Sequence, residues 1–85
     1  MFFVYILKSK KDKNLYIGYT SDLRKRFKEH NLGLVKSTKS KMPWYLVYYE
    51  AYASRQDAIK REENLKLRAK ALRQLKNRIK ISLEA

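Results

Sequence analysis

The chain has 85 residues and no cysteine, and its 21 Lys and Arg against eight Asp and Glu give a formal net charge of +13. This length suits one hydrophobic core, so we expect a single domain over residues 1–85, and the lack of cysteine excludes disulfides, thiolate metal sites and a cysteine nucleophile. The basic residues are spread along the whole chain, which favours nucleic acid as the partner, and no apolar run is long enough to span a membrane.

Two apolar segments near the start of the chain predict a β-hairpin. Residues 2–7 and residues 15–19 are rich in aromatic and β-branched side chains, and Gly18 lies inside the second segment. Between them, Asp12, Lys13 and Asn14 favour a turn.

A first helix is expected from about residue 21 to residue 32. Ser21 and Asp22 are N-cap candidates, and Gly33 is a suitable stop. One face carries side chains at helical spacing, namely Leu23, Phe27, His30 and Leu34.

The second half of the chain predicts one strand and two helical segments. Residues 35–43 form a basic loop, residues 44–53 give the strongest strand signal, and Ser54 with Asp57 resembles a capping box that starts a helix. The apolar positions of the first helical segment are Ala58, Ile59, Leu65 and Ala69, and those of the second are Leu72, Leu75, Ile79 and Leu83. We place a bend near residues 67–70. The predicted fold class is α/β of the α+β type: a small, three-stranded, mainly antiparallel sheet flanked by helices in the order β-β-α-β-α-α.

Glu62 is the carboxylate of most interest for chemistry. It falls between Ala58 and Leu65 on the inward stripe of its helix, where a carboxylate needs a partner. A metal ligand facing a cleft and a salt bridge at the edge of the core fit this position equally well. Glu50 in the third strand is a weaker candidate. The carboxylates do not form the spaced cluster of a two-metal site.

Arg26 and His30 are four residues apart and share one face of the first helix. Arg26 is suited to clamping a phosphate and His30 to accepting a proton, although a solvated Arg and a core His are the commoner outcomes. On the hairpin, Tyr16 shares its strand face with Gly18, which leaves open space for a phosphate beside the phenol. The ordinary alternative to a catalytic role for Tyr5 and Tyr16 is that both side chains simply pack in the protein core.

Taken in order, four motifs resemble those of the GIY-YIG nuclease superfamily, and the resemblance covers nearly the whole chain. The motifs are Phe3-Val4-Tyr5, Tyr16-Ile17-Gly18, Arg26 with His30, and Arg61-Glu62. Residues 57–62 after an aromatic strand, and Thr38 before Pro43, resemble the short stand-alone group related to the nuclease domain of the bacterial excision-repair endonuclease subunit. Phe3 stands in place of the Gly of the first triplet. Asn77 has no motif around it and stays outside the predicted site.

The resemblance implies a metal-dependent endonuclease that hydrolyses phosphodiester bonds, with one divalent metal, Mg²⁺ or Mn²⁺, held by Glu62. Tyr5 would act on the attacking water as general base or through a hydrogen-bond relay, and Tyr16 would support the water or the phosphate. Arg26 would stabilise charge on the phosphoryl group, and His30 would assist proton transfer or hold the tyrosine.

We expect the substrate to be DNA rather than RNA, in repair or recombination, and the protein to be a cytoplasmic monomer with no obligate protein partner. The residues expected to contact nucleic acid are Gly18, Arg24, Lys25, Lys28, Lys36, Thr38, Lys39 and Lys41. Two alternatives stay open: a non-catalytic nucleic-acid-binding module of the same fold, and a basic amphipathic helix at residues 69–83 that binds a membrane surface or a partner protein.

Overall fold

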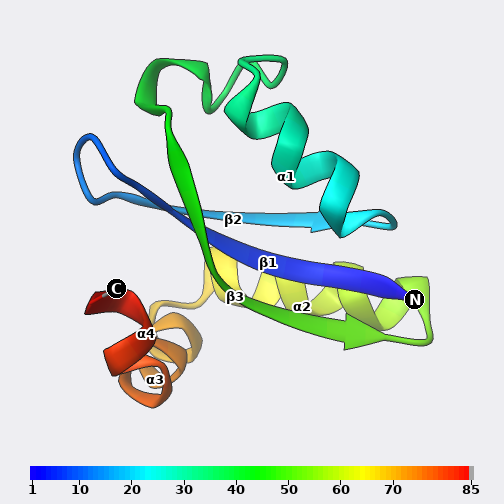
Figure 1. Cartoon of the computed structure of the whole chain (residues 1–85). Helices are drawn as coiled ribbons and strands as arrows, with labels where there is room; N and C mark the ends of the chain where they lie inside the picture. Colours follow the sequence, from blue (N-terminus) through cyan, green and yellow to red (C-terminus); the bar gives the residue numbers. More distant parts are fainter. Residues whose placement is uncertain (85) are drawn as a thin grey trace.

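A three-stranded antiparallel sheet forms the centre of the molecule (Figure 1). The structure, a computed structural model, describes residues 1–84. The strands are β1 (Phe2–Ser9), β2 (Leu15–Thr20) and β3 (Trp44–Tyr52), and the central β1 pairs with both neighbours in the spatial order β2-β1-β3. The helices are α1 (Leu23–Asn31), α2 (Arg55–Leu67), α3 (Ala69–Arg78) and α4 (Lys80–Glu84), with a 3₁₀ turn at Lys39–Lys41. The predicted α+β class is confirmed, with one helix more than expected.

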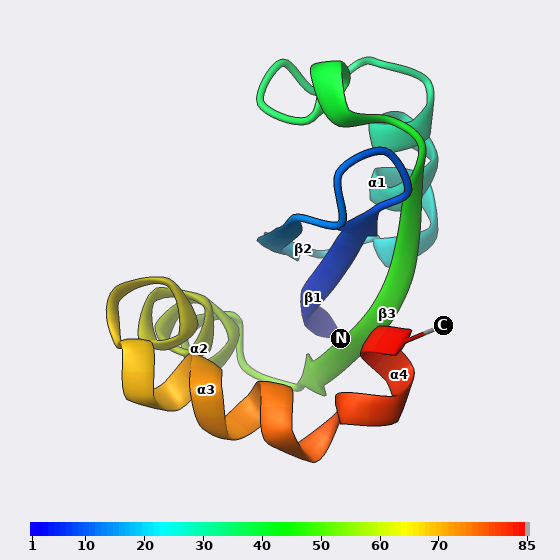
Figure 2. The same cartoon turned by 90° about the vertical axis from the view of Figure 1, so that its left-hand side faces the viewer.

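Helices cover both faces of the sheet, and this explains the continuous apolar run of β1. Figure 2 shows α1 and the 32–43 loop on one side of the sheet and α2, α3 and α4 on the other. Successive side chains of a strand point to opposite faces, so the part of a central strand that is covered on both sides is apolar on both faces. Four consecutive residues of β1 are accordingly buried: Val4, Tyr5, Ile6 and Leu7.

The two faces carry separate apolar clusters. Val4 and Ile6 pack with buried residues of the C-terminal helices, namely Ala58, Leu65, Leu75 and Ile79. On the α1 face, Tyr5 and Leu7 pack with Trp44, and Leu23 and Phe27 of α1 close over them. Tyr5 is therefore anchored in the core on the same face as α1.

The start of α1 follows the expected capping chemistry. The Asp22 side chain accepts the backbone N–H of Lys25 at 3.1 Å, and Gly33 has a φ of 75° just after the helix. Leu34 is 68% exposed, so it does not continue the face that the sequence spacing shares among Leu23, Phe27 and His30. The chain leaves the helical path at Gly33, and the 3.6-residue period stops there.

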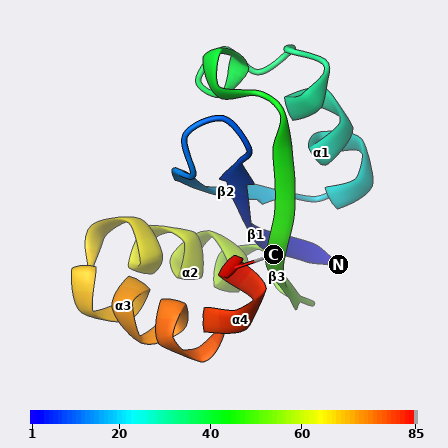
Figure 3. The same cartoon turned by 60° about the vertical axis from the view of Figure 1, so that its left-hand side comes forward.

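The C-terminal helices fold back on one another along the α2 face of the sheet (Figure 3). Ser54 caps α2 by accepting the N–H of Asp57, and the expected bend occurs at Arg68, which has an extended backbone. Ala69 is exposed, contrary to its predicted place on the inward stripe, because it lies beyond this bend. A second break at Ile79 divides α3 from α4, where the sequence predicts one continuous segment. Within residues 1–84, no helix combines the length and apolarity needed to cross a membrane.

Candidate active site

The Tyr5 ring lies directly over the backbone of Gly18. The strand register pairs Tyr5 with Gly18 and Leu7 with Tyr16, so these residues share the α1 face of the sheet. A Cβ added to Gly18 would overlap Cζ and Oη of Tyr5. The Tyr5 ring therefore fills the open space that the sequence predicts for a phosphate beside Tyr16. Gly18 makes room for this ring and does not provide the predicted contact with nucleic acid. Gly18 lets the Tyr5 phenol reach across β2.

His30 connects the Tyr5 phenol to Thr38 through two buried hydrogen bonds. Oη of Tyr5 lies 2.8 Å from Nε2 of His30, and Nδ1 of His30 lies 2.7 Å from Oγ1 of Thr38. The Thr38 hydroxyl also donates to the Val35 carbonyl at 3.4 Å, so its oxygen accepts the Nδ1–H of His30. This network assigns Nε2 as the acceptor of the Tyr5 hydroxyl proton.

Burial fixes the protonation states of this pair. Burial, together with the nearby charge of Arg26, lowers the pKa of His30 to about 4, so the imidazole is neutral at pH 7. Burial also raises the pKa of Tyr5 to about 12, and the hydrogen bond and charge of Arg26 offset only part of that rise. The resting site holds a neutral phenol that donates to a neutral imidazole.

Tyr16 lies against the same imidazole. Its ring centroid is 5.2 Å from that of His30, 6.4 Å from that of Tyr5 and 6.2 Å from that of Trp44. The hydroxyl-bearing ring is half-buried. Aromatic edges therefore surround His30 and exclude water from the imidazole, which is the physical cause of its lowered pKa.

Arg26 and Glu62 act electrostatically on the Tyr5 phenol from helices on opposite faces of the sheet. The hydrogen bond and charge of Arg26 of α1 lower the pKa of the phenol, and the negative charge of Glu62 of α2 raises it. Arg26 is held by Glu29, with Nη1 and Oε1 3.2 Å apart, and its side chain is 39% exposed. Glu62 is held by Lys66, with Oε2 and Nζ 3.0 Å apart. Of the five predicted catalytic residues, Tyr5 and His30 share a hydrogen bond, Arg26 and Glu62 act on the Tyr5 phenol through their charges, and Tyr16 packs beside the His30 ring.

Glu62 offers one carboxylate for a metal ion. Among residues 1–84, no three His, Cys, Asp or Glu side chains gather closely enough to form a metal cluster. Mg²⁺ commonly keeps several waters and binds through one or two carboxylates plus substrate phosphates, so a single partly exposed carboxylate such as that of Glu62 fits it. The Lys66 ammonium would have to move off Glu62 for the carboxylate to act as a ligand.

A shallow groove of about 350 Å³ lies beside Arg26, at the start of α1. Arg26, Lys25 and Glu29 line one wall, and residues 19–22 line the other. Lys25, which is one of the predicted nucleic-acid contacts, therefore lines this groove. Arg24, Lys28, Lys36 and Lys39 are exposed, and Lys41 is half-exposed and pairs with Asp12 at 3.4 Å.

Thr38 does not fit its predicted contact with nucleic acid. Thr38 is completely buried, its hydroxyl is hydrogen-bonded to Nδ1 of His30, and its backbone carbonyl accepts the Trp44 indole N–H at 3.0 Å. Sequence spacing gave no signal for this role, since Thr38 follows His30 by eight residues through an irregular loop. The role of Glu29 as the ion-pair partner of Arg26 had one signal in the sequence, namely that the two residues are three positions apart on a helix.

Glu50 anchors α2 and takes no part in the site. Its carboxylate accepts Nε and Nη2 of Arg61, each 3.0 Å away, and the hydroxyls of Tyr48 and Tyr52. Burial opposes ionisation, but hydrogen bonds from Arg61, Tyr48 and Tyr52 outweigh it and hold the pKa of Glu50 below its usual value. Asn77 is exposed on α3.

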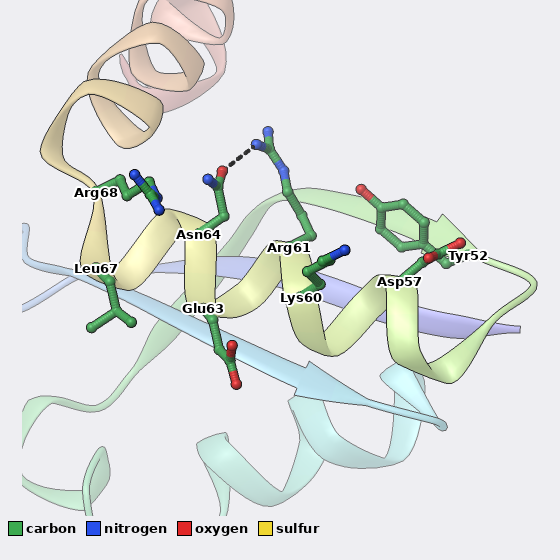
Figure 4. A pocket seen from close by; sticks show the side chains of 8 residues that line it. All are labelled: Tyr52, Asp57, Lys60, Arg61, Glu63, Asn64, Leu67 and Arg68. Carbon is green, nitrogen blue, oxygen red and sulfur yellow. Dashed lines mark hydrogen bonds between the residues drawn. The ribbon is translucent and has the colours of Figure 1, made fainter.

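A larger cavity, about 740 Å³, lies along the outer side of α2 (Figure 4). Arg61, Asn64 and Arg68 project along one side of the helix, and Arg61 donates to Asn64 at 3.1 Å. The basic side chains that line this cavity alternate with the carboxylates of Asp57 and Glu63. Its lining does not include Tyr5, Arg26 or Glu62. Size alone therefore does not identify the site, and we place it at the Tyr5 phenol.

The chain belongs to the GIY-YIG family: residues 1–78 match the family model described as the GIY-YIG catalytic domain, a nuclease domain. UPF0213 proteins from Staphylococcus aureus strains Mu3 and N315 are each 44% identical over 79 residues, covering 89% of this chain and 95% of theirs. The solution NMR structure of the UPF0213 protein BH0048 from Bacillus halodurans is similar, with a TM-score of 0.55 and 37% identity over 88% of this chain and 82% of that one. The resemblance predicted from the ordered motifs is confirmed.

Proposed function

We propose that the protein is a metal-dependent endonuclease that hydrolyses phosphodiester bonds, with DNA as its substrate and repair or recombination as its setting. The observation that carries the proposal is the buried hydrogen-bonded chain from Tyr5 through His30 to Thr38, with Arg26 and Glu62 acting on the same phenol. A buried phenol with a shifted pKa, on which two opposite charges act, is typical of a functional site.

The relay form of the mechanism is favoured over direct action by a phenolate. With a pKa of about 12, the Tyr5 phenolate is scarcely populated at neutral pH. The neutral His30 imidazole, however, accepts a hydrogen bond from the phenol, with Oη and Nε2 2.8 Å apart. As the attacking water loses a proton to Tyr5, the Tyr5 hydroxyl proton passes to Nε2 of His30, and Thr38 holds the ring in the tautomer that receives it.

Arg26 and Glu62 complete the proposed site. The guanidinium of Arg26 stabilises the negative charge that grows on the phosphoryl oxygens. Glu62 would hold Mg²⁺ or Mn²⁺, and the bound metal would supply charge neutralisation at the phosphate and increase the acidity of a nearby water. Lys66 keeps the Glu62 carboxylate paired when no metal is bound.

The test compares wild type, Glu62→Gln and the matched control Glu63→Gln on labelled single-stranded, duplex, flap and branched DNA and on RNA, with Mg²⁺, Mn²⁺ or EDTA. We expect metal-dependent cleavage that falls at least about 100-fold in Glu62→Gln and stays near wild type in Glu63→Gln, because the exposed Glu63 lies outside the site. Salt-sensitive binding by all three proteins without cleavage would instead identify a non-catalytic binding module.

A further inference from the structure

A second groove, about 510 Å³, lies on the opposite side of α1 from Arg26, between α1 and β3. Its apolar walls come from three elements of the α1 face: Phe3, Leu23, Phe27, Leu46 and Tyr49. The exposed Arg24 lies at its rim. The groove is apolar inside and carries the charges of Arg24 and Asp22 at its edge, and the catalytic proposal makes no use of it.

Tyr49 is the most exposed ring of this groove. The register pairs it with Tyr5, which places it on the α1 face of the edge strand β3. It is 53% exposed, and Phe3 supports it in a T-shaped contact with centroids 6.0 Å apart. A braced aromatic ring that keeps half of its surface open is a stacking surface for another flat ring.

The two grooves meet at the start of α1. Ser21 and Asp22 line both of them, with Arg26 in one and Tyr49 in the other. A nucleic-acid strand with one phosphate at Arg26 can therefore continue over the beginning of α1 into the aromatic groove.

We propose that this groove receives an unpaired nucleobase of the strand bound at Arg26, stacked on Tyr49, with a neighbouring phosphate against Arg24. This inference rests on the proposed function and specifies its substrate as one with an unpaired nucleotide near the scissile bond. A base inside a duplex is already stacked on both sides and is not free to enter. The net charge of +13 opposes a second copy of the chain at a face rimmed by Arg24, whereas it attracts a polyanion.

The experiment measures binding in EDTA, so it does not depend on cleavage. The probes are a blunt DNA duplex and the same duplex with a short single-stranded tail that carries 2-aminopurine. We expect wild type to quench the tail fluorescence and Tyr49→Ala to bind the tailed probe about tenfold more weakly, with little change on the blunt duplex. Tyr49→Trp should restore binding.

Tyr45→Ala is the matched control. Tyr45 is an exposed tyrosine of the same strand, and its pairing with Lys8 places it on the opposite face of the sheet. No effect of Tyr49→Ala, or an equal loss on both probes, would overturn the inference. So would a wild-type dimer that Tyr49→Ala dissociates, because the groove would then bind a second copy. Binding without any metal-dependent cleavage would reject the nuclease but leave the stacking result readable.

Discussion

The protonation state of His30 follows from its position and is not a property of histidine in general. The side chain is completely buried, two hydroxyls occupy its two nitrogens, and the guanidinium of Arg26 lies nearby. Each of these features disfavours a second proton on the ring. A neutral His30 is what a relay from Tyr5 requires, so the burial that anchors the fold also prepares the proposed chemistry.

The same shift predicts how stability depends on pH. The pKa of His30 is about 4 in the folded protein, below the ordinary 6.5 of an unfolded chain, so the unfolded state binds more protons between these values. Stability should fall as pH decreases from about 6.5 to 4, with this residue contributing roughly 2–3 kcal/mol of the loss. Urea denaturation at pH 7.5 and pH 4.5 measures the change.

The control for this pH prediction is His30→Gln, which removes the titrating ring and keeps hydrogen-bonding groups between Tyr5 and Thr38. Its stability at neutral pH should be lower, but its loss between the two pH values should be smaller than that of wild type. An equal loss in both proteins would assign the pH dependence to carboxylates such as Glu50.

Single residues also show where sequence reasoning stops. The ordered motifs predicted Tyr5, Arg26, His30 and Glu62 as a set because each motif has a fixed position in the family. Nothing local could predict that Thr38 holds His30, or that Gly18 makes room for the Tyr5 ring. Both roles depend on contacts between segments that only the complete fold brings together.

The pairing of β1 with β2 depends on the small size of Gly18. In Gly18→Ala the new methyl group would overlap the Tyr5 ring, whose hydroxyl is tied to His30, so the ring must shift. We expect a loss of about 1–3 kcal/mol in stability and a large loss of any cleavage activity. Urea denaturation and the cleavage assay measure the two effects.

A double-mutant cycle isolates this steric cause. In a Tyr5→Leu background, the three Tyr5 atoms that the methyl group would overlap (Cε1, Cζ and Oη) are gone, so Gly18→Ala should cost much less stability. The same cost in both backgrounds would mean that strand flexibility, and not the contact with Tyr5, decides the effect.

Helix α2 is fixed to β3 by the ion pair of Glu50 and Arg61, whose side chains are only 15% and 27% exposed. Glu50→Ala leaves the guanidinium and two tyrosine hydroxyls without their acceptor. We expect a loss of about 2–3 kcal/mol, somewhat below that of a fully buried pair, in urea denaturation. Glu63→Ala, an exposed change on the same helix, should stay within about 0.5 kcal/mol of wild type. Matching values for the two variants would show that the network adds no stability.

The sequence predicted helices and strands well where the capping residues and the spacing of apolar residues indicate the same boundary. Asp22 and Ser54 begin helices as expected, and the aromatic segment at residues 44–53 forms β3. The division between α3 and α4 was missed because Ile79 continues the apolar period and neither Gly nor Pro marks the break. Packing of Ile79 and Leu83 against the sheet, which is a tertiary effect, overrides the local preference there.

At the scale of the whole molecule, the excess positive charge lies on both sides of the sheet. Residues 66–80 contain seven Lys or Arg and no Asp or Glu. Lys36 and Lys39 lie on the other side, in the loop whose Thr38 contacts His30. Net charge alone cannot say which side meets nucleic acid, but the site lies beside the loop.

Salt dependence separates these two surfaces. Each phosphate contact that is removed should lower the slope of log K against log salt concentration by about 0.7–0.9. The double variant Lys36→Ala/Lys39→Ala should therefore reduce the slope by roughly 1.4–1.8. Lys70→Ala/Lys76→Ala on α3 removes the same net charge from exposed positions and should leave the slope nearly unchanged. Equal reductions would mean that the polyanion contacts both sides of the sheet, and a substrate would then have to wrap around one of the two edge strands, β2 or β3, to reach Tyr5.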